Sequence, residues 1–188
     1  GVLRITLTRG SGPRGYAAPP DAVTRRLLAF TPTSPPALDP TPVRLQWART
    51  PLASSPAVAG IKHLGRLEQV LAASEPAATG VFDRLMGDAE GRPLCGTRCN
   101  LFLRRGRALL TPALSRAGVA GAVRELLLET GARMARAVID EVAEVEVGRA
   151  DLLAADELFV TNSVFGLRAV GELLDCDGTS LLECAAPG

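Results

Sequence analysis

The sequence is poor in several residue types, and the scarcest charged residue is lysine. Of 21 basic residues in the 188-residue chain, 20 are arginine, and Lys62 is the only lysine. Histidine, tryptophan and tyrosine also occur once each. Arginine can replace lysine in an ion pair, but its guanidinium stays protonated and cannot act as a nucleophilic amine. The single lysine therefore suggests amine chemistry at position 62, the alternative being an exposed lysine kept by chance.

Other absences argue against whole classes of protein. No stretch approaches 18 uninterrupted apolar residues, so no membrane-spanning helix is expected. The formal net charge of +1 gives no reason to expect nucleic acid or a membrane surface as a partner. The composition, 47% hydrophobic and 22% charged, is ordinary for a soluble globular chain, and 188 residues are enough to form a hydrophobic core. The chain begins with Gly1 directly in a strand pattern, with neither an initiator Met nor a signal peptide, which suggests a fragment.

The four cysteines raise the question of a metal site. Cys95 and Cys99 are spaced so that they could supply two zinc ligands. The only histidine is next to Lys62, however, and Cys176 and Cys184 lie far along the chain. We therefore predict no metal site and expect free thiols in a cytoplasmic protein.

Alternation of apolar and polar residues predicts most of the secondary structure as strands. Residues 2–8 are expected to form a half-buried strand, and 32–42, which are rich in proline, a connection. The further expected strands are 25–30, 43–50, 81–86, 101–104, 108–110, 142–147, 158–161 and 167–174, with a short helix at 150–154. The chain is thus divided into 1–31, the end of an N-terminal region with strands and a substrate loop, the 32–42 connection, and a large domain at 43–188.

Two helices are expected to carry functional residues. Apolar residues at helical spacing from Leu64 to Leu71 place Lys62 just before or at the start of a helix that Pro76 stops. The second helix opens at residues 118–124. Its predicted apolar stripe consists of Val119, Ala122, Val123, Leu126 and Leu127. Glycines flank its N-terminus, where free backbone N–H groups and the helix dipole suit a phosphate.

The lysine segment resembles a known family. Residues 60–71 read Gly-Ile-Lys-His-Leu-Gly-Arg-Leu-Glu-Gln-Val-Leu, which is similar to the pyridoxal-phosphate lysine segment of the aminodeoxychorismate lyases. That family belongs to the fold-type IV group, with the D-amino acid and branched-chain aminotransferases. Three further stretches resemble it in the same order: 9–16 (Arg-Gly-Ser-Gly-Pro-Arg-Gly-Tyr), 96–102 (Gly-Thr-Arg-Cys-Asn-Leu-Phe) and 155–163 (Ala-Asp-Glu-Leu-Phe-Val-Thr-Asn-Ser). His63 and the Arg-Leu-Glu-Gln run favour the lyase over its transaminase relatives.

The resemblance implies a fold and an activity. The fold would be α/β (α+β), the C-terminal large domain of a fold-type IV enzyme, with a mixed sheet curled into a pseudo-barrel and flanked by helices. The enzyme would be a homodimer that uses pyridoxal 5'-phosphate to convert 4-amino-4-deoxychorismate to 4-aminobenzoate and pyruvate in folate synthesis. Two alternatives stay open: an aminotransferase of the same fold, and a non-catalytic relative.

The same resemblance assigns roles to individual residues. Lys62 would hold the cofactor as a Schiff base and then act as general base. The remaining cofactor-binding residues would be Val119 on one face of the ring, the N–H groups of Ala122 and Val123 on the phosphate, and Asn162 and Ser163 as a second phosphate contact, for which simple turn formation is the alternative. Substrate-binding residues would be Arg14 and Tyr16, which suit a carboxylate, and Thr97.

The sequence departs from the family pattern in three ways. Cys95 stands where the family has the glutamate that pairs with the pyridine nitrogen, and Gly65 where asparagine is usual. A thiol cannot keep that nitrogen protonated, so we expect Cys95 to favour elimination over transamination, unless it only packs as a small apolar residue. The family's smaller N-terminal domain, with an arginine for the phosphate, is not found before residue 9. The 188-residue chain by itself is therefore expected to bind the cofactor weakly.

Overall fold

The computed structural model describes residues 1–34 and 41–184. The chain divides into two units, Gly1–Asp39 and Pro40–Gly188, which are described separately. Most of the connection predicted at 32–42 lies outside the described residues.

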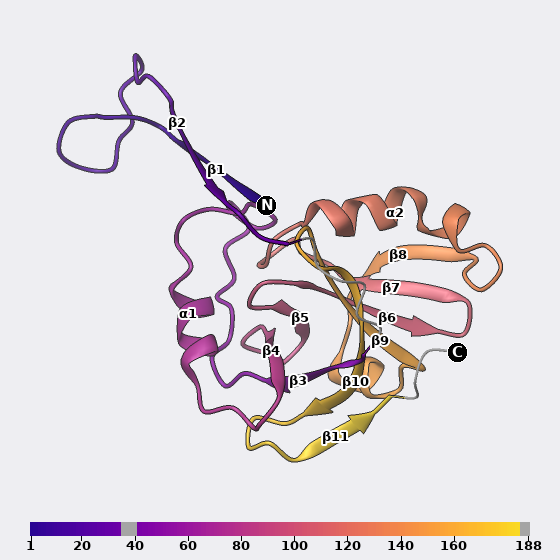
Figure 1. The fold of residues 1–188 in the computed structure, drawn as a ribbon. Coiled ribbons are helices and arrows are strands. Elements are labelled where there is room, and N and C mark those ends of the chain that lie inside the picture. Colours follow the sequence, from indigo (N-terminus) through magenta and orange to yellow (C-terminus); the bar gives the residue numbers. More distant parts are fainter. Residues whose placement is uncertain (35–40, 185–188) are drawn as a thin grey trace. The chain divides into compact units, whose positions relative to one another are not determined.

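The first unit is built on a two-stranded antiparallel hairpin. Strand β1 (Val2–Thr8) pairs with β2 (Arg25–Thr31), and Val2 faces Thr31 in the register (Figure 1). Both predicted strands are confirmed. The prediction that residues 2–8 are half-buried is wrong, because Leu3, Ile5 and Leu7 are 56%, 60% and 64% exposed. A two-stranded ribbon has no second layer of its own to cover either face.

The second unit is a nine-stranded mixed sheet, six strands of which close into a ring. The ring runs β10–β3–β4–β5–β6–β9 and back to β10. Its strands are β3 (Val43–Trp47), β4 (Val81–Gly87), β5 (Pro93–Gly96), β6 (Asn100–Arg105), β9 (Glu157–Asn162) and β10 (Gly166–Leu174). β3 runs parallel to both of its neighbours, and the other pairs of the ring are antiparallel. This ring confirms the predicted pseudo-barrel of a mixed sheet.

Three more strands extend the sheet beyond the ring. β7 (Ala108–Pro112) and β8 (Glu141–Val145) continue outward from β6, and β11 (Ser180–Glu183) pairs with β10. The sequence analysis did not predict β5 or β11. Both are strands of only four residues, which is too short for a periodic pattern to stand out.

The ring encloses the largest apolar core of the chain. Its fully buried members, at 0–1% exposure, are Leu45, Leu85, Leu101, Leu103, Leu152, Leu158, Val160 and Leu173. Burying a side chain of this size contributes about 1.5–3 kcal/mol, so these residues dominate the stability of the unit. The strand predicted at 43–50 is confirmed as β3, but the alternating sequence gives it no exposed face, because four of its five side chains are buried. A central strand of a closed sheet is covered on both faces.

Three helices accompany the sheet. They are α1 (Leu67–Ser74), which contacts β4, α2 (Ala122–Met134), which lies against β8 and β9, and α3 (Arg149–Leu153) (Figure 1). α1 ends just before Pro76, as predicted, but it begins at Leu67, five residues after Lys62 and later than the predicted start near Leu64. Among the described residues, no helix is long and apolar enough to cross a membrane.

The predicted apolar stripe of α2 is only partly correct: Leu127 packs against the buried cluster of Phe102, Leu109 and Ile139, but other members do not contribute. Val119 precedes the helix, Leu126 is 51% exposed, and the buried residues of α2 are Arg124 and Gly131. A Cβ at Gly131 would lie 2.8 Å from Cγ2 of Val142, so β8 approaches the helix closely there. The buried guanidinium of Arg124 donates to the carbonyl of Pro112, at 3.1 Å, and pairs with Glu144. The face toward the sheet therefore includes Arg124 and Gly131, two residues that hydropathy alone would not place in a buried position.

Candidate active site

Lys62 lies on a loop that is pinned to the segment leading into α2. The N–H of Gly60 donates to the carbonyl of Gly118 at 3.2 Å, and the N–H of Ala120 donates to the carbonyl of Gly60 at 2.9 Å. Gly60 has φ +77°, a conformation that side-chain-bearing residues rarely adopt. This short parallel bridge brings the lysine loop beside the N-terminus of α2.

The loop, the helix N-terminus and two strand ends enclose a pocket of about 560 Å³. The pocket brings together seven residues that the sequence analysis had selected: Lys62, Cys95, Thr97, Val119, Ala122, Asn162 and Ser163. Val123 follows Ala122 by one residue inside α2. Side chains separated by a hundred residues thus share one cavity because β9 closes the ring next to β6.

The N-terminus of α2 forms one end of this pocket. Its N-cap is Gly121, and no side chain caps the helix, so the first backbone N–H groups remain available as donors. The preceding residues are held by Asn100, whose side-chain amide donates to the carbonyl of Val119 at 2.7 Å. A Cβ at Gly121 would lie only 2.2 Å from Oδ1 of Asn100. An uncapped helix N-terminus fixed in a tight cradle beside a lysine suits a phosphate-bearing aldehyde such as pyridoxal phosphate.

Asn162 and Ser163 line the same pocket at the end of β9. The side-chain oxygen of Asn162 accepts the N–H groups of Val164 and Phe165, at 2.8 and 3.0 Å, and its amide donates to the carbonyl of Arg98 at 3.1 Å. Asn162 therefore shapes the turn after β9, which is the turn-forming alternative left open by the sequence. Ser163 is exposed at this turn and lines the pocket.

Cys95 lies on the pocket wall as a neutral thiol. Burial and, second to it, the charge of Asp83 together raise the pKa of Cys95 to about 12, against the opposing effect of the Arg66 guanidinium. Burial and Asp83 also raise the pKa of Cys99. All four cysteines are free. Within residues 1–34 and 41–184, no group of three or more His, Cys, Asp or Glu side chains is placed to hold a metal ion.

Asp83 is a site residue that the sequence analysis missed. Its carboxylate, 7% exposed, accepts hydrogen bonds from the Thr97 hydroxyl at 2.5 Å and from the Cys99 thiol at 3.1 Å. The hydroxyl of Thr97, predicted to bind substrate, is thus bonded to Asp83 beneath the pocket wall. An acidic residue within the apolar run of β4 was the available signal, since a buried carboxylate needs partners.

Arg14 and Tyr16 belong to the first unit. Both lie on the loop between β1 and β2, and both are exposed. Their assignment to a substrate carboxylate stays a prediction.

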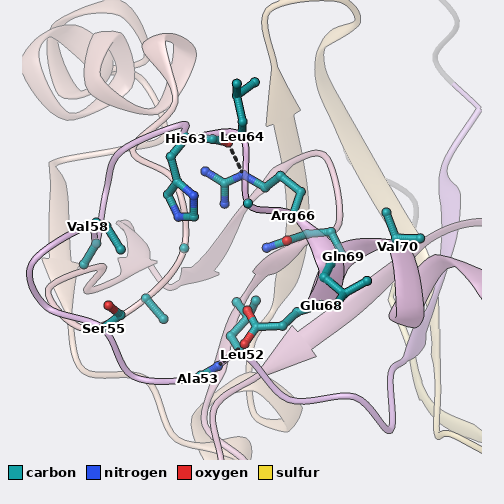
Figure 2. A pocket seen from close by; sticks show the side chains of 15 residues that line it. Leu52, Ala53, Ser55, Val58, His63, Leu64, Arg66, Glu68, Gln69 and Val70 are labelled. Atoms are coloured by element: carbon teal, nitrogen blue, oxygen red, sulfur yellow. Dashed lines mark hydrogen bonds between the residues drawn. The ribbon is translucent and has the colours of Figure 1, made fainter. Parts of the chain in front are cut away.

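A second pocket, of about 740 Å³, is lined by His63, Leu64 and Gly65 of the lysine loop. Figure 2 shows His63 and Arg66 at this pocket, with Glu68 and Gln69 from α1. Neighbouring residues Lys62 and His63 therefore line different cavities, while Arg66 and Gln69 line both. The sequence analysis used Arg66 and Gln69 only as part of the Arg-Leu-Glu-Gln run that favours the lyase, and it assigned neither residue a role in the site.

Comparison with known proteins gives consistent results. The model of the amino-transferase class IV family matches residues 1–173. The aminodeoxychorismate lyase of Vibrio harveyi is 33% identical over 172 residues, covering 89% of this chain and 61% of that protein. The crystal structure of 4-amino-4-deoxychorismate lyase from Pseudomonas aeruginosa is 38% identical, with a TM-score of 0.87, covering 100% of this chain and 67% of that one.

A more distant structure shares the fold alone. The branched-chain amino acid aminotransferase from Escherichia coli is 22% identical with a TM-score of 0.77, covering 98% of this chain and 59% of that chain. This chain thus spans about three fifths to two thirds of the length of the relatives it matches.

Proposed function

This chain belongs to the amino-transferase class IV family, and we propose that it is part of an aminodeoxychorismate lyase that uses pyridoxal 5'-phosphate. The reaction would convert 4-amino-4-deoxychorismate to 4-aminobenzoate and pyruvate, a step of folate synthesis. The observation that carries the proposal is the pocket that the single lysine shares with the uncapped N-terminus of α2.

The residues of the pocket divide the work between binding and proton transfer. The first N–H groups of α2 would hold the phosphate, joined by Ser163, and Val119 would pack against the ring. The cofactor supplies an electron-accepting ring for the carbon that bears the substrate nitrogen. The amine of Lys62 would be the nucleophile that holds the cofactor and the base that takes the proton from that carbon. No other lysine in the chain could take this role.

Two observations favour the lyase over an aminotransferase. The lyase of V. harveyi shares 33% identity, compared with 28% for the branched-chain aminotransferase homologue of Methanocaldococcus jannaschii. Cys95, held neutral by burial, cannot protonate a ring nitrogen, and this handicaps transamination more than elimination, because formation of an aromatic product assists elimination.

We also propose that the enzyme is a cytoplasmic homodimer. The four free thiols are in keeping with a reducing compartment. Apolar side chains on the hairpin and near α1, such as Leu7, Phe30, Leu64 and Leu67, are each 64–70% exposed and would be covered by association.

Borohydride trapping combined with a product assay tests the proposal. Incubation with pyridoxal 5'-phosphate, reduction and peptide mapping should place the label on Lys62, and the wild type should form 4-aminobenzoate from 4-amino-4-deoxychorismate. Lys62→Arg keeps the positive charge but has no titratable amine, so it should lose both the label and the activity. Label only at the chain terminus would contradict the proposal. Amino transfer to a 2-oxo acid without 4-aminobenzoate would favour the aminotransferase.

A further inference from the structure

The side chain of Arg66 bonds to the backbone on both sides of Lys62. Its Nη2 donates to the carbonyl of Ile61 at 2.6 Å, and its Nε donates to the carbonyl of His63 at 3.0 Å. Figure 2 shows the guanidinium lying beneath the His63–Leu64 turn, with the bond to His63 drawn as a dashed line. The planar guanidinium thus bridges the carbonyls of the two residues on either side of Lys62.

The backbone of Arg66 is itself well anchored. Arg66 is the N-cap residue of α1, and its carbonyl accepts the N–H of Val70 at 3.0 Å. The helix is tied down in turn by Glu68, whose carboxylate accepts the N–H of Ala53 at 3.0 Å, and by Ala72, which is fully buried. The guanidinium therefore reaches back to the lysine loop from a fixed point.

The lysine loop has little packing of its own. Ile61 and Leu64 are 55% and 68% exposed, and Gly65 has no side chain to bury. The loop is pinned at one end by the bridge at Gly60 and at the other by α1. Between these ends the loop has two backbone bonds, from the N–H of Ile61 to the carbonyl of Val58 and from the N–H of His63 to the carbonyl of Ile61, besides the charge-assisted bonds of Arg66. The bonds of Arg66 are the stronger ones, since their donor is charged.

We propose that Arg66 is a positioning residue that sets the direction of the Lys62 amine by clamping the two carbonyls around it. The inference rests on the proposed role of Lys62. Arginine suits the task because its fork of N–H groups can reach two acceptors at once, whereas a lysine ammonium is a point donor. Arg66 also lines the pocket that contains Lys62, so its charge acts within the site as well as on the loop.

Three variants test the clamp: Arg66→Ala, Arg66→Lys and, as a control, Arg49→Ala. Arg49 is a suitable control because its guanidinium also bonds to a main-chain carbonyl, that of Cys176, and to Asp177 at an exposed site. The first readout is amide hydrogen exchange of residues 61–65 without cofactor, compared with exchange in β6. The second is the fraction of Lys62 trapped by borohydride at a fixed concentration of pyridoxal 5'-phosphate.

Arg66→Ala should speed exchange in residues 61–65 about tenfold or more, without changing exchange in β6, and should lower trapping at Lys62 by a similar factor. Arg66→Lys should show the same two changes, faster exchange and lower trapping, to a smaller extent. Arg49→Ala should match the wild type. Guanidinium ion at non-denaturing concentration should restore trapping in Arg66→Ala, because the vacated site opens onto the second pocket, and should not affect Arg49→Ala.

Unchanged exchange in residues 61–65 of Arg66→Ala, or trapping equal to the wild type, would overturn the clamp. If Arg66→Ala unfolds throughout, as β6 exchange would reveal, Arg66→Lys decides the question by the same two readouts. A wild type that takes no label at Lys62 would refute the proposed function, whereas the exchange measurement would still decide whether Arg66 orders the loop.

Discussion

Replacing Gly121 with alanine tests how the N-terminus of α2 is held at the pocket. Gly121 has φ −80° and ψ 147°, which alanine adopts without strain, so the effect of the substitution is steric. The added Cβ would lie 2.2 Å from Oδ1 of Asn100. Asn100 is 6% exposed, and its side chain has to rotate away, which breaks its 2.7 Å bond to the carbonyl of Val119.

The size of the effect follows from these two contacts. Rotation of Asn100 relieves the crowding but breaks its hydrogen bond, and leaving a buried polar group without that bond costs about 1–3 kcal/mol. We therefore expect Gly121→Ala to lower the free energy of unfolding by about 2 kcal/mol, or roughly 4–8 °C in Tm for a protein of this size. Affinity for pyridoxal 5'-phosphate should fall too, because the displaced segment leads into the helix N-terminus.

A double-mutant cycle with Asn100→Ala isolates the clash. In the Asn100→Ala background the obstructing oxygen is gone, so adding Gly121→Ala should change the urea-unfolding free energy by less than about 0.5 kcal/mol. Additive effects of the two substitutions would refute the reasoning, since they would show that Gly121 and Asn100 do not compete for the same space.

Two further predictions concern the pocket wall and the support of α1. In the complete protein, Cys95→Glu should raise side transamination more than lyase turnover, because a carboxylate there would keep the pyridine nitrogen protonated; equal changes in the two assays, or none, would show that Cys95 does not tune the cofactor. Burial raises the pKa of Glu75, but bonds from the N–H groups of Arg49 and Thr50 and from the Thr50 hydroxyl outweigh it, so the pKa lies below its usual 4.5. A carboxyl group whose pKa is lower in the folded than in the unfolded state contributes stability above its unfolded pKa, and this stability is lost as the pH falls through its folded pKa. Below about pH 4.5 the free energy of unfolding of the wild type should therefore fall more steeply than that of Glu75→Gln. Parallel pH profiles would contradict this.

Local patterns in the sequence determined the individual elements and the position of the lysine. The alternation in residues 2–8 and the helical spacing after Lys62 correspond to β1 and α1, because both patterns depend on neighbours a few residues apart. Proline at 76 ends α1 for an equally local reason. Lys62 could be singled out without a structure, because residue counts alone show that it is the only lysine of the chain.

Tertiary structure decided which side chains share the site and which faces are buried. The alternating pattern of β3 gave no sign that both its faces are covered, because that depends on the closure of the ring. The buried face of α2 includes Arg124 and Gly131 because an ion pair and a close approach to β8, and not hydropathy alone, determine how the helix lies. Asp83, Asn100 and Arg66 acquire their roles only from partners brought near by the fold, since a hydrogen bond needs two groups in place and a single sequence shows one at a time.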